Sequence, residues 1–482
     1  MRKTFWALSC AVALAWPALS NAATADVSNP ASASASSLAA TSGAASNNAR
    51  PVAANADALQ IQRGAYLAVA GDCIACHTAG AGKGSSANKP FAGGLPMAIP
   101  MLGTIYTSNI TPDRASGIGD WSLADFDRAL RRGVSKDGHN LYPAMPYVSY
   151  SKMNDADVAA LYAYFEKGVP AVSHTLPKST IPWPMNMRWP LKFWNMVFLP
   201  EGVYQFKPGQ SEAWNRGAYL VQGLAHCSTC HTPRGIGMQE VALDETGKGF
   251  LGGSILAGWD AYNITSSRNS GIGTWSQAQL AQYLRTGNVP HLAQAAGPMG
   301  EAVEHSFSHL SAQDVDAIAT YIRTIPAVDD GSAAPRTTLG RNATDVDALR
   351  GVALTGAGSA AVNTSASGPM STPASASLDP ARLYLGNCAT CHQATGAGSP
   401  DGYYPSLMRN STVGAADAGN IAQVILRGVH RNASGNDVAM PGFATELSDE
   451  QIAALTDYLT TQFGNPKATL SAKTVAKLRQ AE

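Results

Sequence analysis

Charged residues are scarce in this chain, and neither sign is in excess. Only 14% of the 482 residues are charged, and 34 basic residues balance 34 acidic ones. A nucleic-acid-binding protein carries a basic excess, and a highly charged disordered chain has a large net charge. The composition therefore excludes both classes. The 46 glycines and 28 prolines favour a loop-rich protein with a moderate helix content over a coiled coil.

Long apolar runs are also lacking, except at the start of the chain. Arg2 and Lys3 precede an apolar stretch that ends in a small-residue cleavage site at Ala22. We predict that residues 1–22 are a signal peptide, which removes Cys10. A lipoprotein signal at Cys10 is the alternative, but the apolar run before that cysteine is short and continues past it. No later stretch reaches the about 18 uninterrupted apolar residues of a transmembrane helix. The sequence predicts an exported protein without a spanning helix.

Six cysteines remain, and they fall into three identical C-x-x-C-H units. This spacing is the attachment signature of c-type haem, because two thiols add to the two vinyl groups of one porphyrin and the adjacent histidine becomes the proximal iron ligand. The haem-attachment candidates are Cys73, Cys76, Cys227, Cys230, Cys388 and Cys391, and the proximal candidates are His77, His231 and His392. The sequence predicts three covalently bound haem c groups.

Three other uses of these cysteines compete with haem. Three disulfides are the ordinary expectation in an oxidising compartment. A four-ligand zinc site needs two such pairs, and three pairs do not divide into such sites. A thioredoxin-like redox motif does not demand a histidine at the next position every time. Because all three pairs are followed by histidine in a chain with only 10 histidines, we interpret them as haem motifs.

Methionines beside proline or glycine are candidates for the second axial ligand. They are Met145, Met299 and Met440, and the first two follow their motif histidines at the same separation. A rigid turn in a loop would aim such a sulfur at the iron. The alternative is that these methionines do not bind iron and lie in the core or at the surface. Bis-histidine ligation is a competing hypothesis, but none of the spare histidines recurs at a fixed offset. Those considered are His139, His291, His305, His309 and His430.

The first two units are an internal duplication. A third, shorter unit keeps only the order of the haem motif and the later methionine. The string Arg-Gly-Ala-Tyr-Leu occurs at residues 63–67 and again at 216–220. Four further pairs of positions share one offset: Cys73 and Cys227, Asn109 and Asn263, Trp121 and Trp275, Met145 and Met299. We therefore expect a short array of like domains, each with its own cofactor.

The predicted fold class is mainly α, with three consecutive class I-type cytochrome c domains joined by linkers. Helix starts are expected at Ser122 and Ser276. The expected segments are a signal peptide over 1–22, a flexible Ala/Ser-rich linker over 23–57, haem domain 1 over 58–175, an aromatic and proline-rich bridge over 176–210, haem domain 2 over 211–328, a flexible linker over 329–377, haem domain 3 over 378–466 and a C-terminal tail over 467–482.

Three features keep two interpretations each. Arg132, Arg285 and Arg427 stand before glycine at expected helix ends, where they either cap the helix or pair with haem propionates. The tryptophans of the bridge either cover a domain seam or contact a partner or the membrane interface. The tail can form a weakly amphipathic helix that would add to a membrane contact.

Together these motifs resemble a known family. Arg-Gly-Ala-Tyr-Leu, Asn-Ile-Thr-Pro with Gly-Ile-Gly-x-Trp, Tyr-Pro-Ala-Met-Pro-Tyr, the Trp-Pro-rich bridge and Cys-His-Thr-Pro-Arg surround the three haem motifs. The chain resembles the three-haem cytochrome c subunit of bacterial membrane-bound dehydrogenases. Those include quinone-dependent alcohol dehydrogenase and the flavin-dependent gluconate and sugar dehydrogenases.

The resemblance implies an electron relay. Electrons would pass from a dehydrogenase catalytic subunit, with flavin or pyrroloquinoline quinone, to ubiquinone at the periplasmic face of the inner membrane. It implies a peripheral membrane contact and carries over the twelve haem-binding positions named above. No substrate site and no catalytic residue of its own are expected. The rivals are a self-standing multihaem enzyme, of the peroxidase or thiosulfate-oxidising type, and a free electron shuttle. A haem enzyme needs an open distal position, which a full set of methionines argues against.

Overall fold

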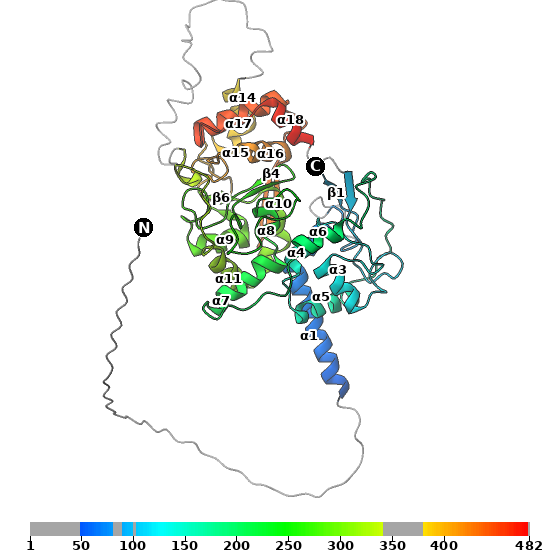
Figure 1. Cartoon of the computed structure of the whole chain (residues 1–482). Helices are drawn as coiled ribbons and strands as arrows, with labels where there is room; N and C mark the ends of the chain where they lie inside the picture. The colour runs from blue at the N-terminus through cyan, green and yellow to red at the C-terminus, as the bar shows by residue number, and fades with distance from the viewer. Residues whose placement is uncertain (1–48, 81–88, 100–102, 341–378, 481–482) are drawn as a thin grey trace, which may run out of the picture. The chain divides into compact units, whose positions relative to one another are not determined.

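The structure is a computed structural model, and it describes residues 49–80, 89–99, 103–340 and 379–480. The predicted signal peptide and most of both predicted linkers lie outside the described residues. Within the described part, helices predominate and the strands form two-stranded antiparallel hairpins (Figure 1). The mainly α expectation is confirmed. None of the described helices is both long enough and apolar enough to span a bilayer.

Most elements can be grouped into three repeats, numbered first to third by the C-x-x-C-H motif that each contains. The first repeat contains α1 (Ala49–Ala70), α2 (Cys73–His77), β1 (Pro96–Ile99), β2 (Gly103–Tyr106), α3 (Leu123–Arg132), α4 (Tyr147–Tyr150) and α5 (Asp155–Lys167). The second contains α7 (Glu212–Tyr219), the π-helical η1 (Leu220–Leu224), α8 (Ser228–His231), β3 (Ser254–Leu256), β4 (Trp259–Ala261), α9 (Gln277–Thr286), β5 (Asn288–Val289), β6 (Ala293–Gln294), α10 (Gly297–His305), the 3-10 helix η2 (Phe307–His309) and α11 (Ala312–Ile322). The third contains α14 (Pro380–Asn387), α15 (Ala389–His392), α16 (Gly419–Arg427), β7 (Val429–Ala433), β8 (Asn436–Met440), α17 (Asp449–Phe463) and α18 (Ala472–Gln480).

The predicted helix starts are confirmed by their caps. Ser122 and Ser276 each accept a hydrogen bond from the backbone N–H three residues on, and the side chain at that position bonds back. Ser448 caps α17 in the same way. Helices α3 and α9 end at Gly133 and Gly287, which both adopt the left-handed conformation that terminates a helix.

In the first two repeats, the first and last helices cross in close contact at a glycine. A Cβ atom on Gly64 would lie 2.0 Å from the Ala160 carbonyl oxygen of α5, and one on Gly217 would lie 2.0 Å from the Ala317 oxygen of α11. Any side chain at these positions would force the helices apart. This crossing explains the glycine of the repeated Arg-Gly-Ala-Tyr-Leu string.

The arginine and tyrosine of that string bind two buried aspartates. Arg63 pairs with Asp157 of its own repeat, and Arg216 pairs with Asp314 at 2.7 Å. The tyrosines reach into the other repeat: the Tyr66 hydroxyl donates to Asp314 at 2.6 Å, and the Tyr219 hydroxyl donates to Asp157 at 2.6 Å. The two repeats therefore exchange equivalent hydrogen bonds and are joined reciprocally.

This reciprocal joint refines the domain expectation. The buried apolar residues of the first and second repeats form one continuous cluster, whereas the third repeat has a separate one. The first two repeats are therefore a fused pair with a shared core. The third repeat docks on the second through polar contacts and through Ala433 of β7, which belongs to the apolar cluster of the first two repeats. Asn420 of α16 exchanges hydrogen bonds with the backbone of Asp260 in β4, and Asn410 donates to Gln294 at 2.7 Å.

Two predicted boundaries differ from the structure. Helix α1 begins at Ala49, inside the stretch expected as a linker. Residues 329–340 of the second expected linker pack on the second repeat, where Asp329 and Asp330 accept hydrogen bonds from Ser267 and Ser270. The 3-10 turn η3 (Arg336–Thr338) also lies there. The rest of that linker lies outside the described residues.

The expected membrane role of the tail is wrong. Val475 of α18 is 0% exposed, and Leu470 and Leu478 pack against the same apolar cluster of the third repeat. Arg479 pairs with Asp449 at 2.8 Å. The apolar face of the tail packs on the third repeat, with Val475 buried and with Leu470 and Leu478 partly buried.

The reciprocal joint predicts the effect of removing each tyrosine hydroxyl. Tyr66→Phe and Tyr219→Phe should each lower the free energy of unfolding by about 1.5–3 kcal/mol, because each loses a hydrogen bond to a charged acceptor. Tyr162→Phe is the matched control: its hydroxyl donates to the Trp121 carbonyl within one repeat, so its loss should cost about 0.5–1.5 kcal/mol. Urea unfolding of the three variants measures this, and equal small effects would contradict the joint.

The same joint predicts a pH dependence. Burial raises the pKa of Asp314, but hydrogen bonds from Arg216 and Tyr66 outweigh it and lower the pKa below its usual range. A lowered folded-state pKa adds stability above the unfolded value of about 3.9 and loses it as pH falls through the folded value. The cost of Tyr66→Phe should therefore be full at pH 7 and shrink below about pH 4.

Candidate functional site

Each C-x-x-C-H motif lies on a single helical turn. Cys73 begins α2, and Cys227 and Cys388 are the N-caps of α8 and α15. Positions three apart on a helix are neighbours on one face, so each motif presents its two thiols together. The histidine that follows ends the same turn. The local structure therefore delivers two thiols and one imidazole as a rigid unit.

A backbone carbonyl holds each motif histidine by its Nδ1 atom. His77 donates to the Ser108 carbonyl at 2.7 Å, His231 to the Tyr262 carbonyl at 2.7 Å, and His392 to the Pro405 carbonyl at 2.9 Å. Burial lowers the pKa of all three imidazoles and favours the neutral form. With Nδ1 engaged, the Nε2 lone pair is free to bind a metal, and the carbonyl fixes the plane of the ring.

The thiols do not have the character of a redox-active pair. All six described cysteines are free. Burial raises the pKa of Cys73 and Cys227 to about 12 and that of Cys230 and Cys388 to about 11, whereas a thioredoxin-type thiol has a lowered pKa. Among the described residues, no three His, Cys, Asp or Glu side chains gather as a metal ion would require. The donor set of two thiols and one histidine fits covalent haem.

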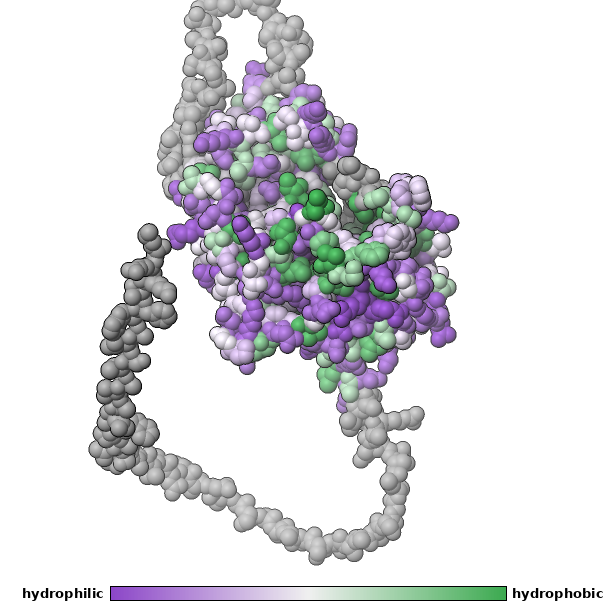
Figure 2. Space-filling model, viewed as in Figure 1, coloured by the Kyte–Doolittle hydropathy of each residue, from purple (hydrophilic) through white to green (hydrophobic). Residues whose placement is uncertain are grey.

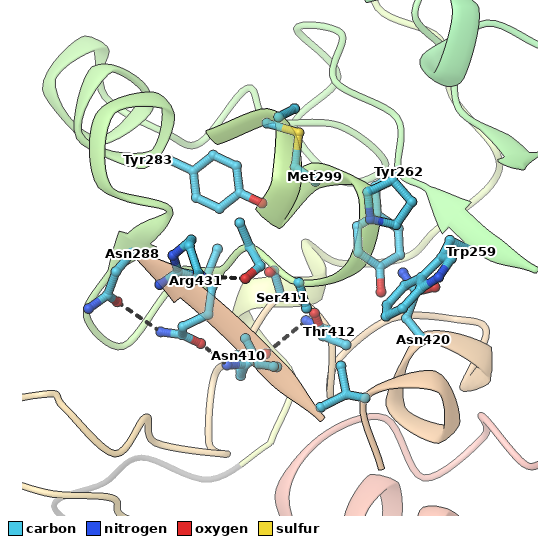
Figure 3. A pocket seen from close by; sticks show the side chains of 18 of the residues that line it. Trp259, Tyr262, Tyr283, Asn288, Met299, Asn410, Ser411, Thr412, Asn420 and Arg431 are labelled. Atoms are coloured by element: carbon cyan, nitrogen blue, oxygen red, sulfur yellow. Dashed lines mark hydrogen bonds between the residues drawn. The ribbon is translucent and has the colours of Figure 1, made fainter. Parts of the chain in front are cut away.

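The second and third motifs open into one shared cavity lined mainly by apolar side chains. Figure 3 shows part of its wall, including Trp259, Tyr283 and Met299. Cys227, Cys230 and His231 line it from the second repeat, and Cys388, Cys391 and His392 line it from the third. Trp275 forms part of the wall and is 6% exposed. Ala70 and Asp72, which directly precede the first motif, also reach this cavity. The first motif therefore begins at the edge of the cavity that the other two share.

Two of the three candidate methionines line the shared cavity, and those two are not in loops. Met299 and Met440 line the shared cavity, and Met145 packs in the apolar cluster that contains Cys73. Met145 lies in a turn before α4, as expected. Met299, however, lies in the first turn of α10, and Met440 ends strand β8. A helix start and a paired strand hold these side chains more firmly than a loop would.

The five competing histidines do not reach the shared cavity. Neither His139, His291, His305, His309 nor His430 is among the described residues that line it. His226, which the sequence analysis did not consider, does line it, and its Nδ1 donates to the Leu224 carbonyl at 2.9 Å. Its ring meets Tyr150 of the first repeat edge-on, with centroids 5.7 Å apart.

Two arginines in the cavity were missed, and the three that were considered lie elsewhere. Arg132, Arg285 and Arg427 are exposed at their helix ends. Arg336 and Arg431 line the shared cavity instead. Arg336 lies in the stretch expected to be a flexible linker, and Arg431 lies in a strand of the third repeat. Neither follows a pattern that sequence spacing could have detected.

Comparison with known proteins agrees with this geometry. The family described as "Cytochrome c" matches residues 61–168 and 215–326, and "Cytochrome C oxidase, cbb3-type, subunit III" matches residues 376–459. The fructose dehydrogenase cytochrome subunit of Gluconobacter japonicus is 40% identical over 435 residues, which is 89% of this chain and 84% of that protein. This chain belongs to the family of dehydrogenase cytochrome c subunits.

Other relatives in this family have different catalytic partners. The gluconate 2-dehydrogenase cytochrome c subunit of Pantoea cypripedii is 41% identical over 88% of this chain and 90% of that protein. The cytochrome c subunit of the quinone alcohol dehydrogenase of Gluconobacter oxydans is 37% identical over 89% and 84%. As a member of the family, this chain is an electron-transfer cytochrome c subunit of a dehydrogenase complex and carries covalent haem c.

Proposed function

We propose that this protein carries three haems and passes electrons from the catalytic subunit of an alcohol, gluconate or sugar dehydrogenase to ubiquinone. We place it at the periplasmic side of the inner membrane, exported by residues 1–22 and attached peripherally. The observation that carries the relay is the shared cavity, because the second and third motifs open into it and the first motif begins at its edge. The names of the relatives support a dehydrogenase partner, which would hold flavin or pyrroloquinoline quinone.

In this proposal the twelve predicted residues hold the three haems. The cysteine pairs fix each porphyrin, His77, His231 and His392 are the proximal ligands, and Met145, Met299 and Met440 are the distal ones. A bound haem supplies reversible one-electron transfer. The chain contributes apolar walls that exclude water, carbonyl groups that orient the histidines, and a fixed order of the three sites. Methionine in each distal position leaves no open site for a substrate, which favours a carrier over an enzyme.

The helices α2 and α10 support the order of this relay. They are in contact, so the first motif lies against the helix that carries Met299. The second haem would therefore stand between the first and the third. The entry point from the catalytic subunit and the exit to quinone would lie at the two ends of this series.

Haem load and axial ligation can be tested together. The denatured mature chain should carry three covalent haems by intact mass. Met145→Ala, Met299→Ala and Met440→Ala should each remove about one third of the methionine-to-iron charge-transfer band and lower one midpoint potential, because one of three thioethers is lost. Met408→Leu is the control, since Met408 is buried in the third repeat and does not line the cavity. A mass with two haems, or an unchanged band in Met440→Ala, would refute the assignment.

An exposed apolar surface supports the membrane or quinone contact. The bridge residues Trp183, Trp189, Phe193, Met196 and Val197 are between 56% and 77% exposed. Figure 2 shows apolar side chains gathered over α6 (Leu191–Phe198), the helix of the bridge. Ile236 and Met238 extend this surface from the loop after the second motif, since Trp194 of α6 donates to the carbonyl of Gly237 at 2.8 Å. Exposed aromatic and Met side chains of this kind suit an apolar interface.

The bridge is only partly a covering for its own fold. Trp194 packs against Tyr147 and bonds Gly237, and Ile181 is 5% exposed, so these two residues belong to the domain seam. Trp189 and Phe193 pack mainly against each other, edge to face at 6.1 Å, and remain exposed. The two interpretations of the bridge therefore apply to different residues within it.

This division predicts which side chains attach the protein. The double variant Trp189→Ser, Phe193→Ser should weaken binding to lipid vesicles more than tenfold, because burial of such a side chain is worth about 1.5–3 kcal/mol. All three haems should remain. Leu59→Ser is the control, since Leu59 is 66% exposed on α1, away from the bridge. Vesicle flotation at low and high salt measures the effect; unchanged binding and unchanged quinone reduction would make the surface ordinary exposed packing.

A further inference from the structure

Arg431 is a buried cation without an ion-pair partner among the described residues, although Glu304 is near enough to act on it electrostatically. It is 1% exposed and is among the largest fully buried side chains of the described residues. Its Nη1 atom donates to the Ala295 carbonyl, but its Nε atom has no hydrogen-bond partner. No described carboxylate forms an ion pair with it. Because an unpaired buried guanidinium is strongly destabilising, an anion must meet it in the complete protein.

Arg336 approaches the same cavity in a similar state. Its Nη1 donates to the Ser270 carbonyl at 3.2 Å, its guanidinium lies 4.4 Å from the centre of the Tyr262 ring, and its Nε atom is buried without a partner. Both arginines are close enough to Tyr283 to act on its hydroxyl electrostatically. Figure 3 shows Arg431 beside Tyr283, with Met299 beyond it. Two unpaired donors therefore converge on one region of the cavity.

We propose that Arg431 and Arg336 bind the propionate groups of the second haem. A haem brings two carboxylates, which match two guanidiniums in charge and in hydrogen-bonding geometry. The contacts select the second haem over the third. Arg431 is in β7 of the third repeat, yet its partner Ala295 belongs to the second. A Cβ on Gly287 would lie 2.6 Å from its Nε. Arg336 stacks on Tyr262, whose carbonyl holds the proximal candidate His231.

The first repeat has an arginine in the corresponding place. Arg188 of the bridge donates to the Asn140 carbonyl at 3.1 Å and lies 3.7 Å over the Tyr142 ring. By the offset of the duplication, Asn140 and the next residue correspond to Gln294 and Ala295, just before the distal methionine. Each duplicated repeat thus receives an arginine from outside itself, and the two arginines bond neighbouring rather than identical positions, Asn140 in the first repeat and Ala295 in the second. This recurrence supports a built anion site.

The inference rests on the proposed haem assignment and deepens it. The third repeat would complete the haem site of the second, so the second haem could not have its full environment until the third repeat has docked. Two cations at the propionates keep those carboxylates ionised at neutral pH. Arg431 and Arg336 are in this sense positioning residues of the middle site, and Arg431 links that site to the third repeat.

The test is spectroelectrochemical titration of the full-length holoprotein. Arg431→Gln should lower one midpoint potential and leave the other two unchanged. That potential should also fall with rising pH in the neutral range, because a propionate without its arginine titrates there. Arg336→Gln should affect the same haem, and Arg431→Lys should restore most of the loss. Arg285→Gln, an exposed arginine at the end of α9, is the control and should change no potential.

The affected haem is assigned with Met299→His and Met440→His. Each of these substitutions is combined with Arg431→Gln and marks one haem. The shift in midpoint potential caused by Arg431→Gln must fall on the haem that Met299→His marks. A shift on the haem marked by Met440→His would overturn the proposal. Unchanged potentials in folded Arg431→Gln and Arg336→Gln would also overturn it. If Arg431→Gln does not retain haem, Arg336→Gln decides, since that side chain is partly exposed. A count of three haems with unshifted potentials rejects the arginine assignment alone, whereas a lower count in the unmutated protein rejects the proposed function.

Discussion

Two buried carboxylates, Asp157 and Asp314, fix the position of everything else in the first two repeats. Each lies in the first turn of the last helix of its repeat. Its carboxylate accepts a hydrogen bond from an arginine in the first helix of that repeat and another from a tyrosine of the other repeat. Such charged acceptors are stable in an apolar core only when every hydrogen bond is made. The first helix therefore has one possible placement. Because α1 ends at Ala70, just before Cys73, the joint also sets where the first haem motif begins.

The candidate haem sites combine parts that act at different ranges. The motif turn is local, since two thiols and a histidine come from five consecutive residues. The carbonyl that holds the histidine comes from a loop roughly thirty residues later in the first two repeats and lies nearer in the third. The candidate methionine lies on a further element, and the two arginines proposed for the middle site come from outside its repeat. A site built in this way is rigid only when all repeats are in place, which suits a relay whose sites must keep fixed separations.

Surface and core uses of apolar residues are separated along the chain. The leucines of the tail and Val475 pack against the third repeat, whereas the aromatic face of α6 is exposed. Both segments are short amphipathic helices, so periodicity treats them alike. The difference arises because α17 and α16 provide a complementary surface for α18, whereas the outer face of α6 meets none among the described residues.

The sequence by itself determined the chemistry of this protein. The three C-x-x-C-H motifs and the helix starts at Ser122 and Ser276 could be recognised from local spacing, because thioether attachment and helix capping act over a few residues. The duplication is visible as repeated strings, and the role of Met145, Met299 and Met440 as iron ligands stays a prediction. Tertiary structure alone decided the fused core of the first two repeats, the shared cavity, the burial of Arg431 and the position of Arg336 in the cavity wall. These depend on contacts between residues far apart in the chain, such as Tyr66 with Asp314 and Arg431 with Ala295. Spacing along the chain carries no record of such contacts, because a polar side chain that is exposed in one fold is buried in another without any change in its neighbours in sequence.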